Sequence, residues 1–218
     1  SGLSDFQISI GNLEYFKGIC GEAGLDEETE LELRELISGK NFFGAEELLE
    51  GIHVNRKDKE LLLKVSDLFG APDILQEAKL AVSNKRSQNA IERLEKVYQV
   101  LCEYGVEKYV SFDLGMLSKY NYYTGIIFKG FTYGVGDAIV KGGRYDNLLR
   151  RFGKDAPAIG FMIVVDDLLA AMNRQGAVIS GIERCGKLYY TPENFREKLL
   201  EARQMRAAGQ CVELLPKR

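Results

Sequence analysis

The sequence contains one histidine among 218 residues and no tryptophan. His53 is therefore the only side chain whose ordinary pKa suits proton transfer near neutral pH. A Ser/His/Asp triad would have to use this residue, and a metal site built from several histidines is excluded. His53 lies between Ile52 and Val54 in an otherwise charged connection. We expect it to be a surface or packed residue and not a catalytic base.

Cysteine is also scarce. The four cysteines are far apart in the sequence and form no Cys-x-x-Cys pair: Cys20, Cys102, Cys185 and Cys211. This pattern argues against a zinc site and against the disulfide framework of a small secreted protein. We therefore predict reduced, buried and chemically inert thiols.

Long apolar runs are absent too, since no segment approaches the roughly 18 consecutive apolar residues of a membrane-spanning helix. The start, Ser1 to Asp5, has neither the basic nor the apolar region of a secretory signal. We expect a cytoplasmic protein that does not contact membranes. The chain lacks an initiating Met, and a strand-like alternation begins already at Phe6–Ile10. These two features lead us to expect an excerpt of a longer polypeptide.

The overall composition, with 45% hydrophobic and 28% charged residues, is that of an ordinary globular protein. A net charge of −3 argues against a general binder of nucleic acids, because such binding depends on basic side chains. Residues 11–104 contain 19 Asp and Glu against 12 Lys and Arg. This acidic block suits a surface that faces solvent or another protein.

The hydrophobic spacing divides the chain into three parts. Residues 11–104 follow a helical period, whereas glycine-separated β-type runs begin near residue 109 and indicate a sheet built from hairpins. A β-α-β pattern covers 187–215. We predict an α+β protein: a mostly antiparallel core (1–10 and 105–176), an all-helical insertion (11–104) and the start of a truncated C-terminal α/β domain (177–218).

The densest polar and aromatic stretch runs from Asp113 to Phe128 and is followed by Lys141–Leu149. In an extended backbone one ring of the Tyr122-Tyr123 pair would point inward, where its hydroxyl could meet a small polar ligand. Cross-strand packing is the alternative. The Gly142-Gly143 pair suggests a tight turn into a helix over 145–152, whose N-terminus could hold an anion.

Three other patterns favour structural explanations. We expect Gly134–Gly136 to form a hairpin turn, because the residues of a phosphate loop do not follow it. Asp166-Asp167 could bind Mg²⁺, but an Asp at this junction more often caps the next helix. Aromatic residues near Lys119 and Lys129 could stack nucleobases, yet so few cations favour packing within the sheet.

Three of these segments, taken together, resemble a known family. Tyr122–Gly125, Gly142–Leu148 and Pro157–Phe161, followed by a helix, occur in the order and spacing of the class II histidyl-tRNA synthetase core. The resemblance covers about residues 105–175 and makes the helical block the insertion domain of that family. It implies a class II aminoacyl-tRNA synthetase-like sheet, with the first two class-defining motifs upstream of Ser1.

Two departures from the synthetases bear on function. Synthetases have Arg-Gly-Leu-Asp where this chain has Ser118–Asn121, and Gly-Leu-Glu-Arg where it has Val164–Asp167. The loss of two cations that would face ATP is incompatible with efficient adenylation. In this respect the chain is similar to ATP phosphoribosyltransferase regulatory subunits, which assemble with the short-form catalytic subunit in the first step of histidine biosynthesis. A divergent histidyl-tRNA synthetase using Lys119 is the alternative, and an RNA-binding sensor is a third.

The resemblance to the regulatory subunits also implies a ligand site. Tyr123 and Tyr145 would contact histidine, Gly142 and Gly143 would shape the pocket, and Tyr122 and Arg144 would support it. The resemblance implies no catalytic residue, metal or cofactor. The expected partners are the catalytic subunit, free histidine and, for the full-length protein, further copies of itself; nucleic acid and membranes are not expected.

Overall fold

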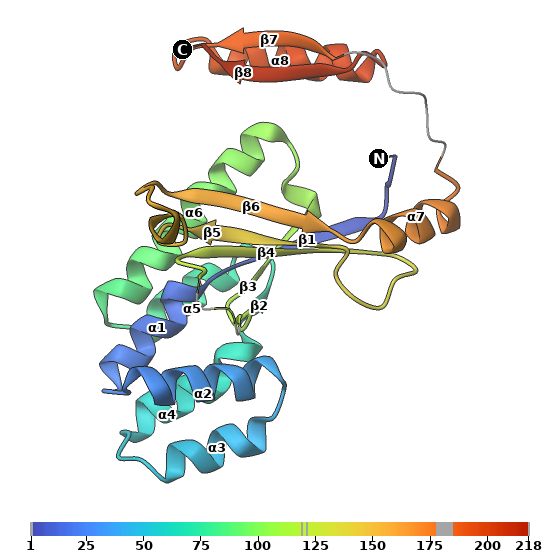
Figure 1. Ribbon diagram of the computed structural model, residues 1–218. Coiled ribbons are helices and arrows are strands. Elements are labelled where there is room, and N and C mark those ends of the chain that lie inside the picture. The colour runs from blue at the N-terminus through green and yellow to red at the C-terminus, as the bar shows by residue number, and fades with distance from the viewer. Residues whose placement is uncertain (1, 119, 121, 178–184, 218) are drawn as a thin grey trace.

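The computed structural model describes residues 2–118, 120, 122–177 and 185–217, and it has the predicted α+β architecture (Figure 1). Six strands form one sheet in the order β2-β3-β1-β4-β5-β6. Only β1 and β3 pair in parallel, so the prediction of a mostly antiparallel sheet is confirmed. The strands are β1 (Phe6–Asn12), β2 (Phe69–Gly70), β3 (Val110–Asp113), β4 (Ile126–Thr132), β5 (Val140–Tyr145) and β6 (Ala158–Ile163).

Most helices of residues 11–104 begin at Asn or Asp residues whose side chains accept a backbone N–H of the first turn. Asn12, Asp26, Asn41, Asn55 and Asn84 cap five of them in this way. These helices are α1 (Leu13–Glu22), α2 (Glu27–Ser38), α3 (Phe42–Glu50), α4 (Arg56–Lys64) and α6 (Lys85–Tyr104), with α5 (Ile74–Ala81) between the last two. Helix α6 ends at Gly105, which adopts the left-handed conformation that favours glycine.

Helices α1 and α6 join the sheet to the rest of the helical block. Their buried faces, with Phe16 and Leu94 fully enclosed, belong to one hydrophobic cluster that also contains Phe112 of β3. The cluster continues into α2, α3 and α4, which lie together on one side of the sheet (Figure 1). Sheet and helical block therefore share a core.

Beyond the sheet, β7 (Gly186–Tyr190), α8 (Phe195–Ala207) and β8 (Val212–Pro216) form the predicted β-α-β unit, with β7 and β8 parallel. In Figure 1 this unit is a separate layer on the side of the sheet opposite α2–α4. It contacts the end of α6, where the Phe195 ring lies 6.0 Å from that of Tyr104 and Arg196 pairs with Glu103 at 2.8 Å. None of the helices in the described ranges is long and apolar enough to cross a bilayer.

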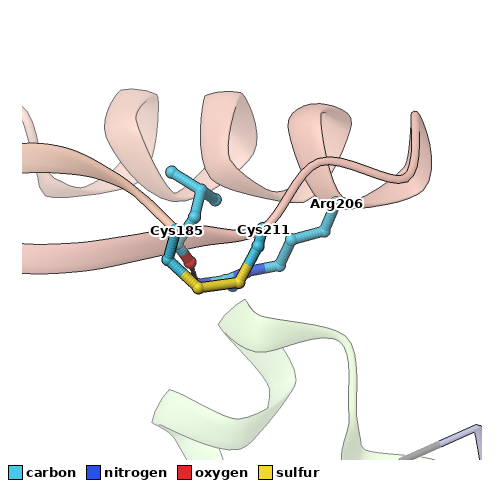
Figure 2. Close-up of a disulfide and its surroundings, with 4 residues drawn as sticks. Cys185, Arg206 and Cys211 are labelled. Carbon is cyan, nitrogen blue, oxygen red and sulfur yellow. Dashed lines mark hydrogen bonds between the residues drawn. A yellow bond between two sulfur atoms is a disulfide. The ribbon is translucent and has the colours of Figure 1, made fainter. Parts of the chain in front are cut away.

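The cysteine prediction is wrong for three of the four residues. Cys185 and Cys211 form a disulfide that joins the start of β7 to the segment before β8 (Figure 2). Cys102 is a free but exposed thiol, and only Cys20 is buried. The pair was missed because the two residues lie 26 positions apart in the sequence and meet only through the parallel pairing of β7 with β8.

Two local predictions are also corrected. The predicted turn at Gly142-Gly143 and the helix over 145–152 are wrong, because β5 runs through both glycines to Tyr145 and a 3₁₀ turn, Leu149–Phe152, follows. The predicted Asp cap is wrong as well: α7 (Val165–Arg174) begins after Val164, with both Asp residues inside its first turn. In contrast, Gly134 has a φ of +89° in the loop between β4 and β5, as the hairpin prediction requires, and His53 is exposed in a turn.

Candidate functional site

A cavity of about 710 Å³ lies between α2, the segment after β3, and strands β4 and β5. It is the site that contains the sequence-predicted residues Tyr123 and Gly142. The lining is mixed polar and apolar: Glu35, Ser38, Gly39, Met116, Leu117, Ser118, Tyr120, Tyr123, Ile127, Phe128, Lys129, Lys141 and Gly142. The cavity can therefore hold a small polar molecule with an aromatic or aliphatic part.

The segment that carries Tyr123 is anchored from both sides. The backbone N–H of Thr124 donates to the carbonyl of Arg144 (2.9 Å), and the Thr124 hydroxyl donates to the Asp146 carboxylate (3.0 Å). Arg144 in turn donates from Nε to both oxygens of Asp146, at 2.9 and 3.1 Å. The carbonyl of Gly125, the residue after Thr124, accepts the N–H of Leu13 at the start of α1 (3.0 Å). Arg144 thus holds the Tyr123 segment directly through its backbone carbonyl and, through its side chain, by way of Asp146.

The tyrosines gather in one cluster next to the cavity. The ring of Tyr122 lies 4.5 Å from that of Tyr123 and 6.1 Å from that of Tyr145, and the Tyr120 ring stacks on it at 5.4 Å. Tyr122 is exposed and Tyr123 is half-buried, but the two rings touch and do not point to opposite sides. Burial, followed by the hydrogen bond with Tyr122, raises the pKa of the Tyr123 hydroxyl, so this group stays protonated at neutral pH.

The glycines of β5 allow aromatic rings to approach the backbone closely. A Cβ atom on Gly143 would lie 2.7 Å from the Tyr123 ring, and one on Gly142 would lie 2.6 Å from the Phe128 ring and from the carbonyl of Gly160. Any larger residue would push these groups apart. The two glycines therefore shape the site as strand residues that leave room for the Phe128 and Tyr123 rings. They do not form the turn that the sequence suggested.

Three charged side chains line the cavity, and the sequence analysis assigned none of them to the ligand site. Lys129 and Lys141 are opposite each other in the pairing of β4 with β5, and Glu35 comes from α2. Lys141 is paired with Asp137 at 2.6 Å. The sequence analysis considered Lys129 only as a cation near aromatic residues that could stack nucleobases. Nothing near Glu35 in the sequence indicated a ligand site, because α2 precedes the lining residues after β3 by about 80 positions.

The structure thus places all six predicted site residues in or beside one cavity. Tyr123 and Gly142 line it, Gly143 lies under the Tyr123 ring, and Tyr122, Tyr145 and Arg144 form the surrounding contacts. Their role in binding histidine stays a prediction. Lys119, proposed as the replacement for a synthetase arginine, lies outside the described residues.

Metal ligands do not gather at this cavity or elsewhere in the described part of the chain, where no group of three or more His, Cys, Asp or Glu residues could hold a metal ion. The chemistry available at the cavity is therefore that of ammonium, carboxylate and hydroxyl groups around an aromatic wall. Such groups bind a polar ligand by charge and hydrogen bonding.

Comparison with known proteins places the chain among two related groups. A family model described as Histidyl-tRNA synthetase matches residues 1–168. The ATP phosphoribosyltransferase regulatory subunit of Acetivibrio thermocellus is 46% identical over 175 residues, which are 80% of this chain and 42% of that protein.

Solved structures give the same grouping. An ATP phosphoribosyltransferase regulatory subunit/histidyl-tRNA synthetase from Bacillus halodurans is 30% identical, with a TM-score of 0.71 over 99% of this chain and 55% of that chain. A chain of the ATP phosphoribosyltransferase (HisG:HisZ) complex from Thermotoga maritima shares the fold alone, at 17% identity and a TM-score of 0.55 over 73% of this chain and 53% of that chain. These matches confirm the class II synthetase-like fold. The chain spans about half the length of the relatives it matches.

Proposed function

The chain belongs to the histidyl-tRNA synthetase family, and from that premise we propose that it is part of a non-catalytic regulatory subunit of short-form ATP phosphoribosyltransferase. Its role is to activate the catalytic subunit and to transmit feedback by histidine in the first step of histidine biosynthesis. The observation that carries this proposal is the 46% identity with a protein named as such a subunit. The name describes a regulatory and not a catalytic role.

One of the two departures from the synthetases, at the start of α7, supports a regulatory role. Asp167 lies in the first turn of α7, at the position where the synthetases have an arginine that binds ATP phosphates. A carboxylate in place of that arginine would repel a polyphosphate instead of stabilising it. Adenylate formation, which depends on positioning and charge stabilisation, is therefore disfavoured.

The ligand part of the proposal assigns histidine to the cavity. Tyr123 and Tyr145 contact it, Gly142 and Gly143 shape its floor, and Tyr122 and Arg144 support the tyrosines. A regulator shifts its partner only through different contacts in the active and inhibited assemblies. The cavity suits this because α2 and the sheet both line it, so a ligand there would couple the helical block to the core.

We also propose the division of the chain that the sequence suggested. Residues 1–10 and 105–176 would be the class II core, 11–104 a helical insertion, and 177–218 part of an α/β domain. The shared hydrophobic cluster supports an insertion that is packed against the core along α1 and α6.

Reconstitution tests the function directly. The protein is mixed with a short-form catalytic subunit, and phosphoribosyl transfer to ATP is measured with and without histidine. We expect the protein to raise the rate and histidine to lower it. The variant Tyr123→Ala should keep the activation and lose the inhibition, whereas Tyr189→Ala, on β7, should change neither. No activation by the wild-type protein would contradict the regulatory role.

A divergent histidyl-tRNA synthetase is the second candidate, because the matching family model carries that description. Histidine-dependent exchange of pyrophosphate into ATP separates the two functions. We expect no exchange; a clear exchange that Tyr123→Ala abolishes would establish the synthetase and overturn the regulatory assignment.

A further inference from the structure

We propose that the end of the helical block formed by α3 and α4 is the surface through which this chain docks on the catalytic subunit. Its occupant is a segment of that partner in which arginine or lysine side chains stand beside apolar ones. The Phe43 surface, as it is named from here on, combines aromatic and apolar side chains with two carboxylates: Phe42, Phe43, Glu46, Leu63, Asp67 and Phe69. This proposal rests on the proposed function, because it names the contact between the regulatory subunit and its partner.

Three phenylalanines at this end of the molecule are exposed instead of buried. Phe43 is 79% exposed, Phe69 56% and Phe42 43%, although the same helical block encloses other large side chains completely. The buried residues of α3, Ala45 and Leu49, lie further along the helix. Single apolar residues scattered over a surface are ordinary, but three aromatic rings that lie together mark a contact site.

The three rings border two adjoining hollows. The first, of about 410 Å³, lies between α3 and the end of α4 and is lined by the Phe42 and Phe43 rings. The second, of about 420 Å³, contains Phe69 and shares Phe42, Ser66 and Asp67 with the first. Helix α3 lies at the end of the helical block away from the sheet (Figure 1). The hollows can therefore receive side chains of a partner that approaches this end of the block.

The charge of the first hollow is negative. Glu46 and Asp67 are the charged residues of its lining; both are exposed, and neither has an ion pair within the described ranges. In the second hollow Lys40 and Lys129 balance Asp67 and Asp113. Unpaired carboxylates beside apolar rings can form charge-assisted hydrogen bonds with cations that a partner brings.

This charge pattern selects the class of partner. Helix α3 contains no Lys or Arg, and residues 11–104 hold 19 acidic against 12 basic side chains, a net charge of −7. Nucleic acid, an anionic membrane and a second copy of the same surface would all be repelled. An arginine of a protein partner would pair with Glu46 or Asp67 and stack on the Phe43 ring, while an adjacent apolar side chain would fill the hollow. The fit is therefore to a basic segment with apolar residues.

Binding of the short-form catalytic subunit, followed by surface plasmon resonance, tests the Phe43 surface. The protein is compared with Phe43→Ala, and the matched control is Phe152→Ala, because that ring is also 79% exposed but lies in the turn before β6. Glu46→Lys reverses one charge of the surface. Glu213→Lys, at an exposed residue of β8, makes the same change of net charge elsewhere and is its control.

We expect Phe43→Ala to raise the Kd for the catalytic subunit roughly tenfold or more, mainly through faster dissociation, as the loss of a central aromatic anchor does. Glu46→Lys should slow association, because charges at an interface steer the encounter of the partners. Added salt should slow association of the wild type and have much less effect on Glu46→Lys. Both controls should bind like the wild type.

The outcomes separate this inference from the proposed function. If the wild type binds and neither Phe43→Ala nor Glu46→Lys changes the kinetics, the docking surface is wrong and the regulatory function stands. A loss of affinity for Phe152→Ala alone would also overturn the proposal and move the contact to the β6 side of the sheet. If Phe43→Ala alters only self-association in sedimentation, the surface faces a second copy, and the proposal fails. No binding by the wild type would overturn the regulatory function, and the docking surface with it.

Discussion

The sheet with its helical block and the β7-α8-β8 unit are stabilised in different ways. The first encloses a continuous hydrophobic cluster that reaches from α3 to the sheet. The second buries only Leu199, Ala202 and Val212 among its described hydrophobic residues, and a disulfide closes its two strands. A unit of this size cannot bury enough apolar surface to be stable on its core alone. Covalent closure offsets what its small core lacks.

The largest effect should come from the continuous core. Phe112→Ala removes a fully buried ring of β3 that packs edge-on against Tyr98, and we expect a loss of about 3–5 kcal/mol in the free energy of unfolding. Chemical denaturation followed by circular dichroism measures it. Leu80→Ala, at an 88% exposed residue of α5, should change the free energy by less than about 0.5 kcal/mol. Equal effects would mean that the cluster is not the stabilising element.

The disulfide should matter next, and only locally. Cys211→Ser opens a loop of 26 residues, which corresponds to about 3.5 kcal/mol of chain entropy. Hydrogen exchange should show lost protection in β7, α8 and β8, with α1 and α6 unchanged. Cys102→Ser, which removes a free thiol, is the control and should have no effect on exchange. Loss of protection throughout the sheet would show that the two regions unfold together.

A smaller effect is expected at the start of α6. The Asn84 side chain accepts the N–H of Ser87 at 2.7 Å and donates to Glu22 at 2.9 Å, so it both caps α6 and ties it to α1. We expect Asn84→Ala to cost about 1 kcal/mol, measured by thermal unfolding. Asn147→Ala, an exposed residue outside any helix or strand, should cost almost nothing. A similar cost for both would exclude a capping role.

Local sequence signals predicted the helical block better than the site. The helical period of residues 11–104 depends on residues within a few positions of one another, and the structure has helices α1–α6 in that block. Gly142-Gly143 misled the prediction because glycine favours turns in isolation, whereas here the close approach of Tyr123 and Phe128 requires glycine inside a strand.

Contacts between distant segments were beyond a local prediction. Glu35 reaches the cavity only because α2 packs next to the segment after β3, and Cys185 meets Cys211 only after β7 and β8 have paired. Neither outcome depends on a spacing or a residue type within one segment. The family resemblance named tyrosines from two segments that the structure brings together beside one cavity, because its motifs already combine segments that meet in the fold.

The smallest predicted effect is a difference in pH dependence between the two regions. Burial raises the pKa of Asp113 in the sheet, whereas a hydrogen bond with Thr191 lowers the pKa of Glu193 before α8. A raised carboxyl pKa means that ionisation is less favourable in the folded state than in the unfolded state, so Asp113 lowers stability as pH rises from about 4 through its folded pKa. Glu193 has the opposite sign and loses its contribution as pH falls.

Asp113→Asn should therefore raise the free energy of unfolding at pH 7 relative to the wild type, with the gain shrinking as pH falls towards 4, because the wild-type carboxyl then becomes protonated too. Glu193→Gln should lower stability at pH 7, and this loss should also shrink at low pH. Urea unfolding at pH 4 and pH 7 measures both differences, and other carboxylates cancel within each comparison. If Asp113→Asn were destabilising at pH 7, its carboxylate would be held by favourable interactions and burial would not be the dominant influence on it.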